Sequence, residues 1–227
     1  MRLFCLAAAL AVGMFAPADP KPNDSTLNAK PPEGAKVLFN GKSLEGWIHR
    51  DGKPASWPVS DGVFTVGPKT GDIMTKDKFD GFKLHLEFNV PYMPKATGQG
   101  RGNSGVYLAG LYELQVLDSY GLKPQDNDCG AIYKQVIPKF NACKPPLQWQ
   151  TYDVTLHKAK YDGDKLVKKT RLTVVQNGIT IIDDAEIVPC PANWGGKESE
   201  PGPLLLQDHG NDVQYRNIWI VPLNEGK

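Results

Sequence analysis

The sequence predicts an all-β fold, a two-sheet antiparallel jelly-roll sandwich. Three observations support this prediction. Segments of alternating apolar and polar residues recur along the chain, 23 Gly and 19 Pro punctuate its 227 residues, and no window shows a sustained helical stripe. More than about ten short strands of this kind are typical of a sandwich or jelly roll. Because no internal repeat of fixed length is visible, a propeller or a solenoid is disfavoured.

The first 18 residues predict a secretory signal peptide. Arg2 precedes an apolar run from Leu3 to Phe15, and the small residues Ala16 and Ala18 mark a cleavage site. This run is shorter than the about 20 residues that a membrane-spanning helix needs. We therefore expect no membrane span, and a protein that is secreted or periplasmic.

The remaining chain divides into a linker and one domain. Residues 19–35 are rich in Pro, Lys, Asn and Asp, which predicts a disordered linker. Residues 36–224 are expected to form a single jelly-roll domain. The 26 basic and 25 acidic residues are interspersed, with a net charge of +1, so the chain lacks the basic face that nucleic acid requires. Nucleic acid is therefore not an expected partner.

Turn dipeptides and period-two alternation place the strands in order along the chain. Asp61-Gly62 and Asn177-Gly178 each lie between two apolar runs and predict tight hairpins, because both central residues of such a turn need a positive φ. Alternation predicts further strands at residues 82–90, 151–157 and 214–221.

The segment from Gly102 to Gly121 predicts a strand that carries acidic and amide side chains. Residues on a strand alternate faces, so Glu113 and Gln115 share one face and Asp118 points to the other. A β-bulge after Gln115 would bring all three to a common face. The spacing would then resemble the Glu-x-Asp-x-x-Glu strand of laminarinase-type glycosidases. Without a bulge, Glu113 and Asp118 would hydrogen-bond loops at a sheet edge.

His209 is the best proton-transfer candidate among the four histidines. It follows a predicted strand directly, between Asp208 and Gly210, where loops gather around the mouth of a sandwich. A structural role in the loop is the alternative. The predicted catalytic residues are Glu113, Asp118 and His209.

Aromatic and polar side chains near these residues predict a carbohydrate-binding cleft. Aromatic rings with polar tips form the usual platform for a sugar ring, and amide or charged groups hydrogen-bond its oxygens. The expected substrate-binding residues are Tyr107, Gln115, Tyr133, Lys134, Gln207, Asp208 and Arg216.

Three cysteines remain after the signal peptide, in a compartment that permits disulfides. Cys129 and Cys143 enclose a short loop, and a bridge between them would contribute about 3 kcal/mol. The alternative is that all three, Cys190 included, are unpaired structural thiols. None of them has the C-x-x-C spacing of a zinc or redox site.

Several sequence blocks, in order, resemble the 3-keto-disaccharide hydrolase domain family, over residues 37–223. The resemblance implies a fold of the concanavalin A-like lectin/glucanase type and a secreted hydrolase of glycosides whose sugar has been oxidised at C3 by a partner sugar 3-dehydrogenase. No cofactor is expected. Jelly rolls of this superfamily often hold calcium, yet Asp126-Asn-Asp128 is too short to indicate a calcium loop. The blocks are residues 38–41, 46–47, 70–73, 102–107, 112–119, 130–133, 149–153, 206–210 and 216–219.

The chemistry that the resemblance implies is compatible with the candidate residues. A ketone at C3 acidifies the proton on C2, so a base such as His209 or Glu113 could remove it while Asp118 assists departure of the C1 oxygen, before water adds. Two alternatives stay open: a carbohydrate-binding module without turnover, and a laminarinase-type β-glucanase. The β-glucanase ranks lower because Gln115 stands where that strand carries an acid.

Overall fold

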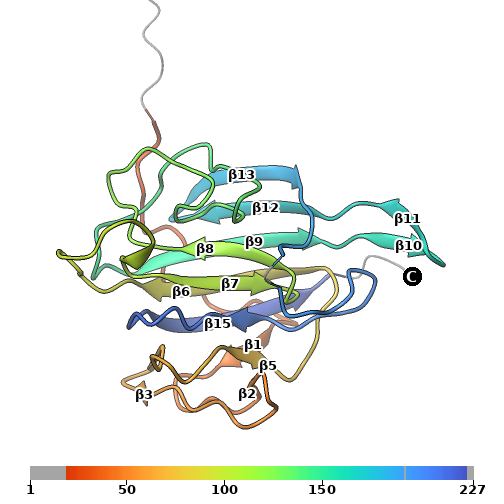
Figure 1. Ribbon diagram of the computed structural model, residues 1–227, viewed down its shortest axis with the longest axis horizontal. Helices are drawn as coiled ribbons and strands as arrows, with labels where there is room; N and C mark the ends of the chain where they lie inside the picture. The colour runs from red at the N-terminus through yellow and green to blue at the C-terminus, as the bar shows by residue number, and fades with distance from the viewer. Residues whose placement is uncertain (1–18, 192, 224–227) are drawn as a thin grey trace, which may run out of the picture.

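A computed structural model describes residues 19–191 and 193–223, which form a β-sandwich (Figure 1). The predicted signal peptide, residues 1–18, lies outside the described residues. The only helical element among them is one short 3₁₀ turn, η1 (Gly98–Gly100), and the all-β prediction is confirmed. The strands are β1 (Lys36–Phe39), β2 (Trp47–His49), β3 (Val59–Ser60), β4 (Val63–Thr65), β5 (Ile73–Thr75), β6 (Phe82–Asn89), β7 (Ser104–Leu108), β8 (Tyr112–Val116), β9 (Gln150–His157), β10 (Lys160–Asp162), β11 (Lys165–Lys168), β12 (Arg171–Gln176), β13 (Ile179–Glu186), β14 (Leu205–Leu206) and β15 (Gln214–Pro222).

Two antiparallel sheets make up the sandwich. The larger has eight strands in the order β13-β12-β9-β6-β15-β4-β3, with β1 paired to β15. The smaller has five strands in the order β2-β5-β14-β7-β8. In Figure 1, β7 and β8 lie in front of β6 and β9, and the separate β10-β11 hairpin projects to one side.

The core lies between the inner faces of the two sheets. Alternate residues of the strands point inward, so β8 contributes Tyr112, Leu114 and Val116 while β9 contributes Tyr152 and other apolar residues. The outward residues of β8 are Glu113 and Gln115, which the register places on the opposite face of the smaller sheet. The sandwich therefore presents these two polar side chains away from its core.

Both predicted hairpins are present. Asp61 and Gly62 connect β3 to β4, and Asn177 and Gly178 connect β12 to β13. All four turn residues have a positive φ, between 49° and 79°. The turn chemistry alone therefore located two of the strand pairs correctly.

The segment expected to be a disordered linker is instead bound to the outer face of the larger sheet. The backbone N–H of Asn28 donates to the Glu87 carboxylate (2.6 Å), and the amide of Asn217 donates to the Ala29 carbonyl (3.0 Å). Thr26 and Thr151 share a hydrogen bond of 2.6 Å. The expectation was wrong because polar contacts, rather than apolar burial, hold residues 23–31, which we call the strap.

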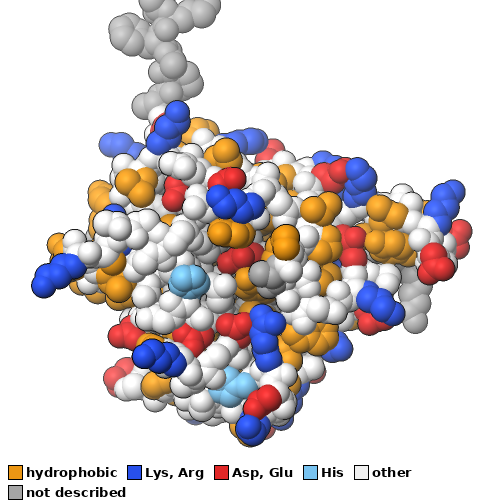
Figure 2. All heavy atoms as spheres, in the orientation of Figure 1, with side chains coloured by type: hydrophobic (Ala, Val, Ile, Leu, Met, Phe, Trp, Pro, Cys, Tyr) orange, Lys and Arg blue, Asp and Glu red, His pale blue; other side chains and the backbone are white. Residues whose placement is uncertain are grey.

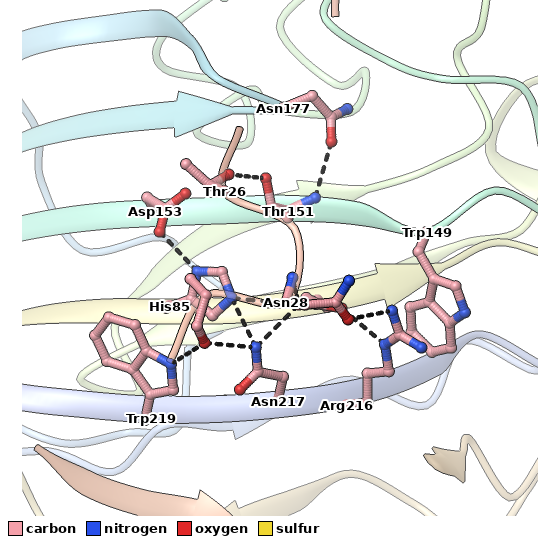
Figure 3. Close-up of polar contacts among 12 residues, drawn as sticks. Thr26, Asn28, His85, Trp149, Thr151, Asp153, Asn177, Arg216, Asn217 and Trp219 are labelled. Carbon is pink, nitrogen blue, oxygen red and sulfur yellow. Dashed lines mark hydrogen bonds and ion pairs between the residues drawn. The ribbon is translucent and has the colours of Figure 1, made fainter. Parts of the chain in front are cut away.

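Beneath the strap lies a cluster of charged side chains (Figure 3). His85 and Glu87 are both fully buried, and His85 Nδ1 contacts the Asp153 carboxylate at 2.7 Å. The Arg216 guanidinium pairs with Glu87 at 2.7 Å and stacks on the Trp149 ring at 4.1 Å. The cluster joins β6, β9 and β15, and Asn28 of the strap binds to it through Glu87 and Arg216.

Cys129 and Cys143 are buried free thiols rather than a disulfide. Their sulfur atoms both lie 3.5 Å from the side-chain nitrogen of Gln176. Of the two arrangements left open by the sequence, the structure shows the unbridged one for this pair.

No helix among the described residues is long and apolar enough to cross a membrane.

Candidate functional site

The smaller sheet places the acidic and amide side chains in adjacent cross-strand pairs. Tyr107 of β7 pairs with Glu113 of β8, and Gly105 pairs with Gln115, in an unshifted register. Because both pairs face away from the core, Glu113, Gln115 and Tyr107 stand on one outer surface. The predicted common face of Glu113 and Gln115 is therefore present.

A cavity of about 180 Å³ opens above these pairs. This volume is below the several hundred Å³ of pockets for drug-sized ligands, and it is suited to a small ligand such as one sugar ring. The cavity collects side chains from η1, β7, β8 and the segments after β8 and β14. Its lining residues are Gln99, Asn103, Tyr107, Glu113, Gln115, Tyr133, Gln207 and His209.

Gly105 leaves room for the Glu113 carboxyl group. A Cβ atom at position 105 would lie 2.8 Å from Glu113 Oε1 and 3.3 Å from Gln207 Oε1. A distance below 3.0 Å forces a neighbour to move, so any side chain here would displace the carboxyl group. Glycine is needed at this position by space, because its φ is not positive.

Glu113 is buried at the floor of the cavity, with 5% of its surface exposed. Burial raises the pKa of its carboxyl group to about 7, with the nearby charge of Asp72 adding to the rise and a hydrogen bond with Tyr107 opposing it. A carboxyl group with this pKa is present in both protonation states at neutral pH. It can therefore accept a proton and return it.

Tyr107 links Glu113 to Gln207. Burial, followed by the charge of Glu113, raises the pKa of Tyr107 well above its usual range, so the phenol keeps its proton. The phenol hydrogen-bonds the Glu113 carboxyl group, and its oxygen accepts from the Gln207 side-chain nitrogen at 3.2 Å. The orientation of Glu113 is thus fixed by a neutral donor.

His209 is exposed at the mouth of the cavity, on a turn that Asp208 holds in place. The two carboxylate oxygens of Asp208 accept from the backbone N–H groups of Gly71 (3.0 Å) and Gly210 (2.9 Å). Asn211 of the same turn accepts from the Asn103 backbone at 2.8 Å. The imidazole therefore projects from an anchored turn over the same cavity that holds Glu113.

Asp118 does not join this group. Strand β8 ends at Val116, and Asp118, two residues further on, is not among the residues that line the cavity. The Asp118 carboxylate is buried in an ion pair with Arg101 at 2.6 Å and also caps the backbone of Tyr120. The expected grouping of Asp118 with Glu113 is therefore not found among the residues that line the cavity, and Arg101 is the partner of Asp118 instead.

Three of the expected substrate-binding residues also lie outside the cavity. Lys134 is exposed and pairs with Asp126 at 3.1 Å, and Asp208 supports the His209 turn instead of lining the cavity. Arg216 lies under the strap on the outer face of the larger sheet (Figure 3). Glu113 is on the smaller sheet, so the sandwich separates the two residues. The position of Arg216 is incompatible with binding a ligand beside Glu113.

Two lining residues were not among the candidates. Asn103 lies in the Gly-Asn-Ser-Gly block, so its place next to β7 was a usable signal. Gln99 lies in η1, and no local pattern distinguishes it from any other loop glutamine. Only the folding of the chain places η1 beside β8 and so brings Gln99 to the cavity.

The surroundings of the site carry mixed charge. Figure 2 shows acidic and basic side chains interspersed on this face of the molecule, with no extended field of one sign. Within residues 19–191 and 193–223, no group of three or more His, Cys, Asp or Glu side chains is arranged to hold a metal ion.

Comparisons with known proteins agree with this fold. A protein from Parabacteroides distasonis, a candidate glycosyl hydrolase with a crystal structure, is 36% identical; the match covers 96% of this chain and all of that one, with a TM-score of 0.79. A second candidate glycosyl hydrolase from that organism is 24% identical, with coverages of 84% and 94% and a TM-score of 0.60, and shows the same fold.

A curated relative is the 3-keto-disaccharide hydrolase of Bacteroides thetaiotaomicron. It is 24% identical over 85% of this chain and 79% of its own length. Residues 34–221, most of the chain, match the family described as the 3-keto-alpha-glucoside-1,2-lyase-like domain. The chain belongs to this 3-keto-alpha-glucoside-1,2-lyase-like domain family.

Proposed function

We propose that this protein hydrolyses the glycosidic bond of 3-keto-glycosides or 3-keto-disaccharides, with Glu113 as the base that removes the proton from C2. One observation carries the proposal. The Glu113 carboxyl group is buried in a cavity of about 180 Å³ and its pKa is raised to about 7. A base with a pKa near the working pH is the most effective proton acceptor that a carboxyl group can provide.

The reaction proceeds by elimination followed by addition of water. Glu113 takes the C2 proton, the C2–H electron pair forms a C1–C2 double bond, and the C1–O bond breaks with its electron pair on the leaving oxygen. That oxygen takes a proton from His209. While the C1–C2 double bond exists, the Glu113 carboxyl group exchanges the proton it took with solvent. Water then adds to C1 and gives a proton to His209, while Glu113 gives its exchanged proton to C2. The net change is hydrolysis, and both side chains recover their starting states.

His209 is preferred to Asp118 as the acid because of its position. The imidazole lies at the cavity mouth, where a leaving group would depart, whereas Asp118 is held by Arg101 outside the cavity. The same placement argues against the β-glucanase alternative. A retaining glycosidase needs two carboxyl groups about 5 to 5.5 Å apart, and Asp118 was the second one expected.

The proposal includes the location of the protein and a functional partner. The apolar segment at residues 3–15 supports secretion to a periplasmic or extracellular location. A 3-keto substrate must come from a reaction that oxidises a sugar hydroxyl at C3, so a sugar 3-dehydrogenase is the proposed functional partner. The family described above and the curated Bacteroides thetaiotaomicron relative support this substrate class.

The proposal is tested by offering the purified protein methyl 3-keto-α-glucoside and its unoxidised parent, methyl α-glucoside. We expect release of methanol from the keto compound alone, because only the ketone acidifies the C2 proton. Equal turnover of both compounds, or turnover of the parent only, would contradict the proposal. Binding of the keto compound with no turnover would favour a carbohydrate-binding module instead.

Matched variants assign the base. Glu113→Gln preserves shape but cannot accept the proton, so kcat should fall by about 100-fold or more. Asp118→Asn removes the ion pair with Arg101, which should lower the melting temperature while kcat changes by less than about tenfold. An equally severe loss of kcat in a folded Asp118→Asn variant would restore the two-carboxylate mechanism.

A further inference from the structure

Three residues that line the cavity each have a buried side-chain oxygen with no hydrogen-bond partner among the described residues. They are Asn103 Oδ1, Gln115 Oε1 and Gln207 Oε1. Asn103 and Gln115 are each 1% exposed, and all three residues line the cavity with Glu113. A buried acceptor without a partner is destabilising, so three of them on residues that line one small cavity indicate a ligand that donates hydrogen bonds.

The orientation of two of these amides is determined by backbone carbonyls. Gln99 donates from Nε2 to the Asn127 carbonyl (2.8 Å), which leaves Gln99 Oε1 as an acceptor for Gln115 Nε2 (2.8 Å). Asn103 Nδ2 donates to the backbone carbonyl of Gln99 at 2.7 Å. Because carbonyl oxygens only accept, the nitrogens of Gln115 and Asn103 must face Gln99. Their oxygens are consequently left as the unpartnered atoms.

Gln207 is oriented independently, from the other side of the cavity. Its Nε2 donates to the Tyr107 hydroxyl at 3.2 Å, and that hydroxyl is bonded to Glu113. Gln207 Oε1 and Glu113 Oε1 both lie within 3.3 Å of the position that a Cβ on Gly105 would occupy. The free oxygen of Gln207 is therefore close to the carboxyl group proposed as the base.

We propose that Asn103, Gln115 and Gln207 form an acceptor-only cradle that selects a sugar ring by its hydroxyl groups, and that Gln99 is the residue that positions it. The identity of the ring rests on the proposed function. A 3-keto-glucoside ring has three free hydroxyls, at C2, C4 and C6, which equals the number of unpartnered oxygens. Its ketone oxygen only accepts, so it turns away from the cradle toward Tyr133 and His209 at the remaining wall.

The cradle explains why the cavity would select a sugar ring in which a ketone replaces the C3 hydroxyl. At C3 the ketone has no hydrogen to donate, and the cradle has no fourth amide oxygen to leave unpaired. Removing a second hydroxyl would leave a buried oxygen without a donor, and analogues lacking a required hydrogen-bonding group are rejected strongly for this reason. Specificity thus resides in the amides and reactivity in Glu113.

The test uses binding, so that it does not depend on turnover. The probe is a 3-keto C-glucoside, whose C1–C bond cannot be cleaved, together with its 2-deoxy, 4-deoxy and 6-deoxy forms, titrated by calorimetry. In the unaltered protein each deoxy form should bind about tenfold more weakly than the parent, the loss of one hydrogen bond. Failure of the proposed function would show as binding without turnover of the O-glucoside, and would leave this test intact.

Three single variants match the three oxygens: Asn103→Leu, Gln115→Met and Gln207→Met, each checked for an unchanged circular dichroism spectrum. Each should bind the parent about tenfold more weakly and should no longer distinguish it from one deoxy form, a different one for each variant. If every variant still penalises all three deoxy forms equally, the cradle is wrong. Parent binding that EDTA abolishes and Ca²⁺ restores would also overturn it, because the oxygens would then be cation ligands.

Gln99→Met provides a control for positioning. It removes the acceptor of Gln115 and leaves the Tyr107-to-Gln207 bond untouched. Discrimination of the hydroxyl assigned to Gln115 should therefore weaken, while the hydroxyls assigned to Asn103 and Gln207 are unaffected, because Asn103 is oriented by the backbone carbonyl of Gln99. A Gln99→Met variant that loses all three discriminations together would show that Gln99 merely supports the fold.

Discussion

At the scale of single residues, the function depends on the environment of Glu113. Burial makes its charged form costly, which is why its pKa is raised to about 7. The base must be ionised to act. We therefore expect kcat/KM for the 3-keto-glucoside to rise about tenfold per pH unit as the pH rises toward 7. A pH profile that is flat between pH 5 and 7 would show that another group is the base.

Gly105 is the second residue on which the site depends. A methyl group on its Cα would lie 2.8 Å from Glu113 Oε1, so Gly105→Ala must displace the carboxyl group. We expect kcat/KM to fall by about 100-fold, since displacement of a reacting group by about 1 Å has this effect, while the protein still folds. Gly121→Ala is a control for a glycine in open space, and should keep its activity although its positive φ makes it slightly less stable.

At the scale of elements, the strap is a structural part of the sandwich. Burial alone would raise the pKa of Glu87, but hydrogen bonds from His85, Asn217, Arg216 and the Asn28 backbone hold it at about 2. Because this folded pKa lies below the ordinary value, the stabilisation is complete above about pH 4.5 and is lost as the pH falls toward 2. This stabilisation is on the order of 3 kcal/mol, the free energy that corresponds to lowering the pKa of a fully buried carboxyl group from its ordinary value to about 2.

The lowered pKa of Glu87 predicts how the melting temperature of Glu87→Gln depends on pH. The variant should melt at a lower temperature than the unaltered protein at pH 5 to 6, and the difference should shrink as the pH falls from 4.5 toward 2. His85 has the opposite dependence, since its pKa is raised despite burial, by Asp153 and Glu87, and its contribution is lost as the pH rises. A melting difference for Glu87→Gln that is constant down to pH 2 would refute this account.

Removal of the strap should change the stability of the protein without changing its catalytic activity. Deleting residues 19–31 exposes Glu87 and His85 and breaks the contacts of Asn28 and Ala29. We expect a lower melting temperature and an unchanged kcat/KM, because the strap and the cavity lie on outer faces of different sheets. A large loss of kcat/KM in the folded deletion variant would contradict this placement.

At the scale of the whole molecule, local patterns predicted the strands and long-range contacts decided the site. Asn177-Gly178 specifies a turn from two adjacent residues, and the alternation of Glu113 and Gln115 follows from strand geometry, so both were predictable. The position of the Asp118 side chain was not predictable in this way, because it depends on an ion pair with Arg101, which belongs to another segment. The strap was misjudged because its polar composition conceals hydrogen bonds to strands over 50 residues distant.

The same distinction applies to Gln99 and Gln207. Gln207 reaches the cavity because β14 pairs with β7, about 100 positions away in the sequence, and only the folded sheets bring it beside Gly105. Gln99 orients Gln115 through its side-chain amide, and no sequence pattern distinguishes this glutamine from others. Residues that act by orienting others are recognised from hydrogen-bond direction, which a single sequence does not contain.

The proposed function depends on removal of the C2 proton by Glu113, and hydrolysis in D₂O measures this step directly. Water addition after elimination should place deuterium on C2 of the released 3-keto-glucose, at a level above that of enzyme-free 3-keto-glucose under the same conditions. Glu113→Gln should neither release this sugar nor label it. Rapid release of 3-keto-glucose with no deuterium at C2 beyond the enzyme-free level would contradict the elimination mechanism.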